Sequence, residues 1–378
     1  MTVPVIAAYV RSPFQPARKG ELVDVRPDEL CGQVVRALVE RSGVDGGEIE
    51  DLTVGCAFPE GEQGMNMGRI AGVLAGLPRS VAGATVNRFC GSSMQAVHTA
   101  AGAIALDMGE AYIAAGVESM TRVSGREDAY EPHPVLAASY PQLYLAMGET
   151  AERVAERFGV SRERQEAFAV ESQRKAAEAR SEGRLRAEIT PVQNGAREIA
   201  ADGCPRPGTT AAVLATLAPA FRPDGCVTAG TSSPLTDGAA ACLVTSAGYA
   251  ERRGLRPLAA IRAFALSGCQ PEIMGIGPIE ATRKVLARAG LTIDDVDVME
   301  LNEAFASQVL AVIDGLGIDP ERVNLDGGAI ALGHPLGATG ARITGKAAQL
   351  LQRTGGRYAV AAQCIGGGQG IATLLERV

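Results

Sequence analysis

The chain has 378 residues and a formal net charge of −7, and 46% of its residues are hydrophobic and 21% charged. This length predicts two or three packed units, and the composition is typical of a soluble globular protein. The negative charge, the absence of Trp and an aromatic content of 4% argue against a nucleic-acid surface, which needs positive charge and flat side chains for base stacking. No apolar run reaches the roughly 18 residues of a membrane-spanning helix, so we expect no membrane insertion.

The first predicted element is a short strand at residues 1–6, without the charged region and long apolar stretch of a secretory signal. Eight cysteines are spread singly along the chain, with no C-x-x-C pair and no metal-ligand spacing beside the three histidines. This pattern is typical of reduced thiols in a cytosolic protein, most of them packed as small hydrophobic residues. We therefore expect a cytoplasmic protein that binds no metal.

An early and a late part of the chain have similar patterns. Residues 50–56 are typical of a helix end followed by a strand, and residues 294–302 repeat that pattern. Each is followed by an amphipathic segment, a Val-Asn step, a long helix that begins at a reactive residue, and a strand at 112–116 or 358–362. Alternating strands and helices of this kind predict two α/β halves with central sheets covered by helices.

Cys90 stands at the predicted start of the first long helix and is followed by Gly91, Ser92 and Ser93. Free backbone N–H groups and the positive end of the helix dipole predict a lowered thiol pKa there, and two N–H groups could hold an oxyanion. Alone, the motif is only moderately specific, because cysteines that merely pack in a core are common. His98 lies about two turns further along the same helix, and we expect it to pack.

Residues from about 118 to 229 break the alternation of strands and helices. They contain a proline-bearing loop and two charged helices, the second capped by Ser161 and closed by Gly183. The spacing of apolar and charged residues predicts one buried and one solvated face for that helix. We interpret the segment as an insertion laid over one face of the core. It could hold a substrate or only an oligomer contact, and the sequence favours neither.

Two polar candidates stand in the late half. Asn302 and Glu303 follow the late strand, where active-site loops of α/β sheets gather, although Asn302 could equally cap a turn. His334 precedes Pro335, which suits the first turn of the second long helix. A positive helix end disfavours an imidazolium, so we expect a neutral His334 that could act as a base.

Cys364 follows a strand-like run and precedes the glycine-rich run 366–370. We expect a helix to open there as well, so that free N–H groups and the helix dipole stabilise the thiolate. Together with Cys90 and His334, Cys364 would supply the parts for covalent thioester chemistry with a second acid/base group.

Four motifs follow one another along the chain: Cys90-Gly91-Ser92, Asn302-Glu303-Ala304-Phe305, Gly333-His334-Pro335 and Cys364-Ile365-Gly366. In this order they resemble the thiolase family over essentially the whole chain, and most of all the members that cleave 3-ketoacyl-CoA in bacterial fatty-acid β-oxidation. The resemblance implies an α/β thiolase fold, with two similar halves in a five-layered α-β-α-β-α core and an inserted loop domain that binds coenzyme A. We expect an N-terminal half of residues 1–117 plus 230–254, an inserted domain of residues 118–229 and a C-terminal half of residues 255–378.

The resemblance implies a role for each catalytic candidate. Cys90 would carry the acyl group, and His334 would be the base that activates it. Cys364 would protonate the departing acetyl-CoA carbanion and then deprotonate the incoming coenzyme A. Asn302 would fix a water that binds the thioester oxygen together with His334, and the N–H groups of Cys90 and Gly366 would form a second oxyanion hole.

The resemblance also implies that coenzyme A is a co-substrate and that no cofactor is bound permanently. Arg206 would lie near the adenine and phosphates, and Ser233 beside the pantetheine arm. The substrate tunnel would be lined by Met147, Phe221, Ala229, Met274 and Phe305. A homodimer or homotetramer is implied as well, and a separate hydratase/dehydrogenase subunit is compatible with the resemblance.

Some positions bear on alternatives to degradative thiolysis. Ala146 stands where acetoacetyl-CoA-specific members carry His, so its small side chain implies a roomier pocket and weakens a biosynthetic interpretation. Thr231 and Thr236 stand where many members have Asn, which could alter local loop bonds but not the catalytic set. A decarboxylating condensing enzyme would carry His or Asn in place of Cys364. A non-enzymatic acyl-CoA carrier would need neither Cys364 nor Asn302.

Overall fold

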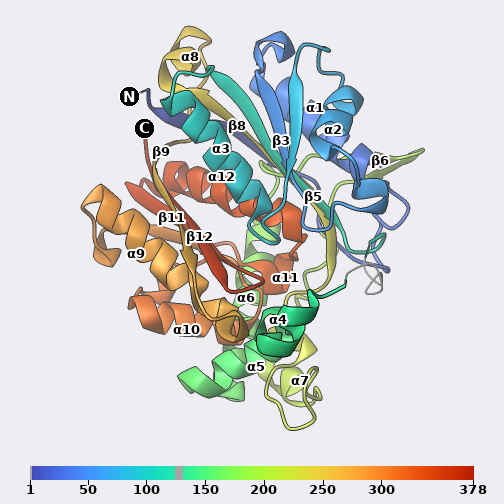
Figure 1. The fold of residues 1–378 in the computed structure, drawn as a ribbon, viewed down its shortest axis with the longest axis vertical. Helices are drawn as coiled ribbons and strands as arrows, with labels where there is room; N and C mark the ends of the chain where they lie inside the picture. Colours follow the sequence, from blue (N-terminus) through green and yellow to red (C-terminus); the bar gives the residue numbers. More distant parts are fainter. Residues whose placement is uncertain (1, 124–130) are drawn as a thin grey trace.

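The computed structural model describes residues 2–123 and 131–378 (Figure 1). Residues 124–130, which belong to the predicted insertion, lie outside the described residues. Within the part of the chain that is described, no helix combines the length and hydrophobicity needed to cross a bilayer.

Five strands form the sheet of the N-terminal half, in the spatial order β1 (Pro4–Arg11), β8 (Thr236–Ser246), β5 (Ala111–Ser119), β3 (Asp51–Gly55) and β4 (Ala82–Val86). β5, β3 and β4 are parallel to one another, whereas β8 is antiparallel to both of its neighbours. Every residue of β5 and β8 is buried, as expected for alanine-rich strands covered on both faces. β8 therefore belongs to this sheet although it follows the insertion in the chain. The two-residue strand β2 (Gln15–Pro16) also pairs with β8.

The C-terminal half repeats this arrangement with β9 (Ala259–Gly268), β12 (Gln369–Glu376), β11 (Tyr358–Ile365) and β10 (Val298–Leu301). β10 and β11 are parallel, and β12 is antiparallel to both of its neighbours. A parallel bridge from Met299 to Val323 takes the place that β4 has beside β3. The predicted repeat is confirmed, because both halves have the same spatial order of equivalent strands.

The two sheets meet along a short antiparallel seam between β1 and β9. Val5 pairs with Ala260 and Ile6 with Ala259, so the two expected sheets form one continuous sheet of ten strands. The seam is short because β1 pairs with β8 along nearly its whole length, while most of β9 pairs with β12.

Two helices form the middle layer between the halves. α3 (Ser92–Ala105) and α12 (Leu336–Thr354) pack against each other and against strands of both halves (Figure 1). Their approach is close, because a Cβ added to Gly340 would collide with the backbone of Met94. The largest buried apolar cluster of the described residues surrounds these two helices.

Four helices form the outer layers. α1 (Pro27–Ser42) and α2 (Met67–Ala75) cover the outer face of the N-terminal half. α9 (Gly277–Ala289) and α10 (Ala306–Leu316) cover that of the C-terminal half. The layers therefore follow the order α-β-α-β-α, as expected. Two short helices complete the halves: α8 (Ala247–Arg252) and α11 (Ala329–Leu332).

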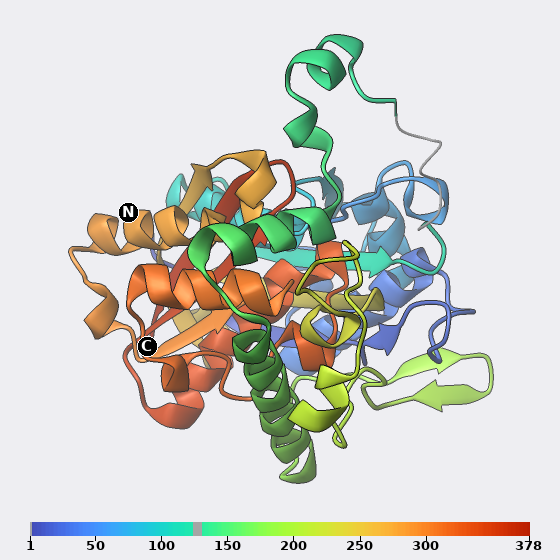
Figure 2. The ribbon, with the colours of Figure 1, turned by 90° about the horizontal axis from the view of Figure 1, so that it is seen from below.

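The inserted segment has its own elements: α4 (Pro134–Ser139), α5 (Met147–Phe158), α6 (Arg162–Ser181), β6 (Val192–Asn194) paired with β7 (Arg197–Ile199), and α7 (Ala211–Ala215). Ser161 caps α6 as predicted, by accepting a hydrogen bond from the N–H of Arg164 at 3.3 Å, and Gly183 follows the helix with a φ of +75°. α5 and α6 pack against α10, and α6 also packs against α11, while α4 stands away from the body (Figure 2). The insertion thus covers the part of the core that carries Asn302, His334 and Cys364.

Candidate active site

Cys90 lies at a tight corner between β4 and α3. Phe89, directly before it, has a φ of +44°, which a bulky residue rarely adopts. Asn87 Oδ1 accepts a hydrogen bond from the N–H of Phe89 at 2.8 Å. Ser92 Oγ accepts one from the N–H of Arg88 at 2.9 Å and donates one to the carbonyl of Phe89 at 2.6 Å. Because α3 begins at Ser92, this corner places Cys90 at the head of the helix, as predicted.

The sulfur of Cys90 is within hydrogen-bonding reach of two backbone N–H groups, its own and that of Gly366, and both favour the thiolate. Burial nevertheless raises the pKa of the Cys90 thiol to about 12, and the carboxylate of Glu118 adds to the increase. The expected lowering of this pKa is therefore wrong for the resting site, because excluding water from the sulfur outweighs the two N–H groups. Cys90 stays a neutral thiol near pH 7 until a base takes its proton.

Cys364 lies within β11, opposite Gly370 of β12. The helix expected after it is wrong, because Gly367 and Gly368, with φ values of +78° and +83°, turn the chain back into β12. The thiol is buried, and burial raises its pKa well above the ordinary value, with a further increase from the charge of Cys90. The two thiols belong to one site, because the N–H of Gly366, two residues after Cys364, lies within hydrogen-bonding reach of the Cys90 sulfur.

His334 lies just before α12, and it is buried. Its backbone N–H donates to Thr236 Oγ1 at 3.0 Å. Its ring Nδ1 lies 2.6 Å from Thr339 Oγ1, and its Nε2 lies 3.3 Å from Asn302 Nδ2. Burial, assisted by the positive charge of Arg342, lowers the pKa of His334 to about 3. The structure agrees with the expected neutral imidazole, but the main cause is burial.

Asn302 follows β10 and brings its amide to the ring of His334. Its backbone N–H donates to the carbonyl of Ala362 at 3.0 Å, which fixes the loop against β11. Asn302 Oδ1 is buried and has no hydrogen-bond partner among the described residues. A buried acceptor of this kind is stabilised when a water or a ligand donates to it; the water site on Asn302 stays a prediction.

Glu303 is a buried residue whose part in the site the sequence did not reveal. Its Oε2 accepts from Ser172 Oγ at 2.7 Å and from the N–H of Ile330 at 3.1 Å, and its Oε1 accepts from Asn324 Nδ2 at 2.8 Å. These bonds connect α6 of the insertion and the start of α11 to the loop that carries Asn302. The sequence shows the Asn-Glu pair, but a carboxylate in a loop is usually solvated, and only the tertiary structure shows that this one is buried.

Glu118 is a second such residue, at the end of β5. Its carboxylate accepts from the N–H groups of Ala57 at 2.8 Å and Gly337 at 2.9 Å and from Gln63 Nε2 at 2.7 Å. It thereby connects the N-terminal sheet to the first turn of α12, directly after His334. No spacing in the sequence marks it, because its partners come from three separate segments.

Three of the expected tunnel residues gather beside Cys364. Met274 and Phe305 belong to a small buried cluster with Cys364. Phe221 contacts Phe305 edge to face, with ring centroids 5.8 Å apart. The insertion, which carries Phe221, therefore supplies part of an apolar wall next to this thiol.

The other four expected coenzyme A contacts are spread more widely. Met147 begins α5, and its Sδ lies 3.5 Å from where a Cβ on Gly366 would stand, so its side chain lies beside Gly366. Ser233 Oγ donates to a backbone carbonyl beside Phe305 at 3.1 Å. Ala229 and Arg206 are exposed and lie outside the buried cluster that contains Cys364.

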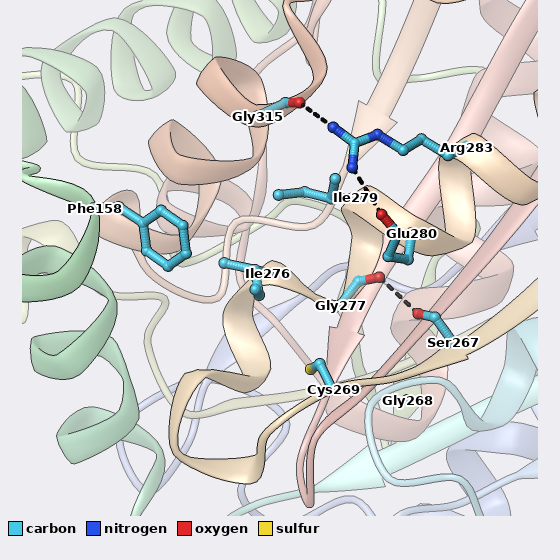
Figure 3. A pocket seen from close by; sticks show the side chains of 10 residues that line it. All are labelled: Phe158, Ser267, Gly268, Cys269, Ile276, Gly277, Ile279, Glu280, Arg283 and Gly315. Atoms are coloured by element: carbon cyan, nitrogen blue, oxygen red, sulfur yellow. Dashed lines mark hydrogen bonds and ion pairs between the residues drawn. The ribbon is translucent and has the colours of Figure 1, made fainter.

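A separate apolar pocket of about 300 Å³ lies between α5, α9 and α10 (Figure 3). Phe158, Ile276 and Ile279 line it, together with the partly exposed Cys269 at the end of β9. None of the catalytic candidates belongs to its lining, so the pocket is distinct from the site around the two cysteines.

The arrangement suits chemistry on a thioester. A neutral thiol faces two N–H donors, a neutral imidazole is held beside an amide, and a second thiol is buried nearby. One thiol can therefore form a covalent adduct whose oxyanion is stabilised by N–H groups, while other groups move protons.

Comparison with known proteins identifies the family. The model "Thiolase, N-terminal domain" matches residues 4–248, and "Thiolase, C-terminal domain" matches residues 255–377. The chain is 47% identical to a 3-ketoacyl-CoA thiolase of Bacillus subtilis (strain 168), with 98% of each chain covered. It is 48% identical to a 3-ketoacyl-CoA thiolase of Acinetobacter baumannii (strain AYE), with 99% of this chain and 98% of the relative covered. The crystal structure of the Bacillus anthracis acetyl-CoA acetyltransferase superposes with a TM-score of 0.91 at 38% identity, covering 100% of this chain and 99% of that one. The chain belongs to the thiolase family.

Proposed function

We propose that this protein is an acyltransferase that cleaves 3-ketoacyl-CoA with coenzyme A, giving acetyl-CoA and an acyl-CoA shortened by two carbons. The observation that carries the proposal is that Cys90 lies against the N–H of Gly366 close to Cys364, while Asn302, bonded to the strand of Cys364, brings its amide to the ring of His334. The names of relatives that match over nearly the whole chain support it.

The first half of the reaction forms an acyl-enzyme. His334 Nε2 takes the proton of Cys90, and the thiolate attacks the 3-keto carbon. The N–H groups of Cys90 and Gly366 hold the resulting oxyanion. The bond between C2 and C3 then breaks, the acyl group stays on Cys90, and the electron pair passes to the acetyl-CoA carbanion.

The second half releases both products. Cys364 protonates the carbanion at C2 to give acetyl-CoA, while the thioester oxygen is held by His334 and by a water on Asn302. The Cys364 thiolate then takes the thiol proton of coenzyme A. The coenzyme A thiolate attacks the acyl group on Cys90, and the released Cys90 thiolate recovers its proton from His334. Each cysteine ends as it began, and the reaction is reversible.

We propose that coenzyme A enters between the insertion and the core. Met147, Phe221, Met274 and Phe305 would line the arm and the acyl chain, since they lie beside Cys364 or Gly366. Ser233 and Ala229 would contact the pantetheine, and the exposed Arg206 would pair with the phosphates. The domain division at residues 117, 229 and 254 is part of this proposal, supported by the pairing of β8 with β1 and β5.

We further propose a degradative, cytoplasmic role in fatty-acid β-oxidation, with coenzyme A as co-substrate and no permanent cofactor. The protein would act as a homodimer or homotetramer, in which a hydratase/dehydrogenase subunit could take part. A biosynthetic acetoacetyl-CoA thiolase is the second candidate. It is favoured by the name of the structural relative and opposed by the small side chain of Ala146.

Acetyl-CoA release from a 3-ketoacyl-CoA on addition of coenzyme A tests the reaction. Mass spectrometry after brief exposure to acyl-CoA, without acceptor, tests the intermediate and should find the adduct on Cys90. An adduct on Cys364 with Cys90 free would reverse the two assignments. Absence of acetyl-CoA release despite an adduct would favour an acyl carrier.

A further inference from the structure

The ring of His334 is hydrogen-bonded on its far side by a residue to which neither the motifs nor the proposed mechanism give a role. Thr339 Oγ1, in the first turn of α12, lies 2.6 Å from His334 Nδ1. The same hydroxyl donates to the carbonyl of Pro335 at 3.0 Å. A threonine hydroxyl has only one proton, so with that proton directed to Pro335 its oxygen is left to accept from Nδ1–H.

The contact on the other ring nitrogen leads to the same tautomer. Asn302 Nδ2 lies 3.3 Å from His334 Nε2, and an amide NH₂ group can only donate a hydrogen bond. With Nδ2 facing the ring, Nε2 is the nitrogen with the lone pair and Nδ1 carries the proton. The contact from the loop after β10 is thus compatible with the protonation pattern that the contact from α12 favours.

We propose that Thr339 is a positioning residue that holds the neutral imidazole of His334 as the Nδ1–H tautomer, so that Nε2 keeps the lone pair with which it takes the proton of Cys90. The proposal deepens the proposed function, in which His334 is the base. Once His334 accepts the Cys90 proton, the Nδ1–H bond to Thr339 keeps the imidazolium in place, as hydrogen-bonded partners of a catalytic histidine do.

The surroundings of Thr339 favour such a role. The residue is buried, so no water competes for the Nδ1 proton at that position. Its hydroxyl is fixed by a carbonyl only four residues earlier in the chain, within the same turn that begins directly after His334. The partner and the ring are therefore held by one short, rigid segment.

The chain also contains a matched control pair. His98 is buried in α3, stacks on Phe264 with ring centroids 4.4 Å apart, and has its Nε2 2.7 Å from Thr373 Oγ1. This is a second buried His–Thr contact, outside the catalytic cluster. Replacing Thr373 should change the environment of His98 without changing the chemistry at Cys90.

The direct test is ¹⁵N NMR of the histidine rings in the full chain. Only three histidines are present, so the ring signals can be assigned by removing each histidine in turn. The wild-type spectrum should show a protonated Nδ1 and an unprotonated Nε2 for His334. A protonated Nε2 in the resting enzyme would overturn the proposal. Because this readout does not depend on turnover, it separates failure of the tautomer assignment from failure of the proposed function.

The kinetic test compares Thr339→Val, Thr339→Ser and Thr373→Val by the rate of Cys90 acylation from acyl-CoA. Val keeps the shape of Thr but cannot accept from Nδ1–H, so the Nδ1–H tautomer should be lost and acylation should slow by about 10²-fold, the lower end of the range for general base catalysis. Thr339→Ser should restore both the tautomer and most of the rate, and Thr373→Val should retain the wild-type rate. Wild-type acylation and an unchanged His334 spectrum in Thr339→Val would overturn the proposal. If Thr339→Val does not fold, the wild-type spectrum and the acylation rate of Thr339→Ser still test the proposal: a protonated Nε2, or a Ser variant as slow as expected for Val, would overturn it.

Discussion

The corner that carries Cys90 and the strand that carries Cys364 hold their thiols in different ways. Cys90 depends on local geometry, with a positive φ at Phe89 and hydrogen bonds within a few residues of the chain. Cys364 depends on the sheet, since β11 pairs with β12 along its whole length. Cys90 is a partly exposed residue just before a helix, although its sulfur is enclosed, and Cys364 is a buried residue within a strand.

This difference suits the two proposed roles. A nucleophile must approach a carbonyl carbon while N–H groups meet the developing oxyanion, and a helix head offers such free donors. An acid that protonates carbon needs only a fixed distance to that carbon and a thiol that stays protonated until it is used, which burial ensures. Both thiols have raised pKa values, so placement, and not acidity in the resting state, separates them.

The largest expected effect is that of Cys90→Ala, which removes the proposed covalent carrier. Acetyl-CoA formation from 3-ketoacyl-CoA should fall by at least ~10⁴-fold, because loss of a covalent nucleophile removes most of the rate enhancement. The assay is spectrophotometric, with Cys31→Ala as the matched control, since Cys31 is buried in α1 on the outer face of the N-terminal half. Comparable losses in both variants, or no loss in Cys90→Ala, would contradict the assignment of the nucleophile.

Cys364→Ala should separate the two thiols. Acyl-CoA should still acylate Cys90, whereas cleavage and condensation of the carbon–carbon bond should each fall by at least ~10²-fold, the usual scale of general acid–base catalysis. Mass spectrometry follows the adduct, and acetyl-CoA release follows the cleavage. A variant that cleaves 3-ketoacyl-CoA at a near normal rate would remove the two-cysteine mechanism.

Ala146→His tests the substrate space on the side of Cys364. Ala146 precedes Met147, whose sulfur approaches Gly366, so a larger side chain there should disfavour long acyl chains. The ratio of kcat/KM for a medium-chain 3-ketoacyl-CoA to that for acetoacetyl-CoA should fall tens- to a hundredfold. The reason is that filling part of a pocket with one side chain changes the transition-state binding free energy by ~1–3 kcal/mol. Ala138→His, on the protruding α4, should leave the ratio unchanged. A strong four-carbon preference in the wild type, unaffected by Ala146→His, would favour the biosynthetic alternative.

The last expected effect concerns the unliganded thiol and not turnover: it is the pH dependence of Cys90 alkylation by iodoacetamide in the absence of substrate. A pKa of about 12 means that the thiolate is a minor species at neutral pH, so the rate should rise about tenfold per pH unit from pH 7 to 10 without a plateau. Peptide mapping should follow Cys90 and Cys364 separately, and Cys364 should react more slowly because it is buried. A plateau below pH 8 would show instead a preformed thiolate.

Much of the fold could be predicted because its signals are local. Helix α6 illustrates this: Ser161 caps it by a bond to a residue three positions later. The repeat of strands and helices is likewise present in the sequence, and the structure confirms it. The wrong expectation at Cys364 has a physical reason as well, since glycines after a strand permit a hairpin as readily as a helix.

The electrostatics of the site could not be predicted in the same way. A helix head favours a thiolate, and this much is visible in the sequence. Burial then reverses the result at Cys90 and acts together with Arg342 at His334. His98 shows why a shifted pKa alone does not identify a base: burial lowers its pKa to about 3 as well, yet it packs against Phe264, outside the catalytic cluster.

By itself, the sequence determined which reactive residues this protein has, their order, and the α/β elements that carry them, because capping, periodicity and motif spacing depend on near neighbours in the chain. The tertiary structure alone decided that Cys90 of the first half meets Gly366 and Cys364 of the second. It also decided that Glu118 and Glu303 are buried, where each accepts hydrogen bonds from segments far apart in the chain. The contact of Thr339 with the ring of His334 was decided in the same way. These contacts depend on how two halves pack around α3 and α12, and that packing sums many weak apolar contacts between segments far apart in the chain.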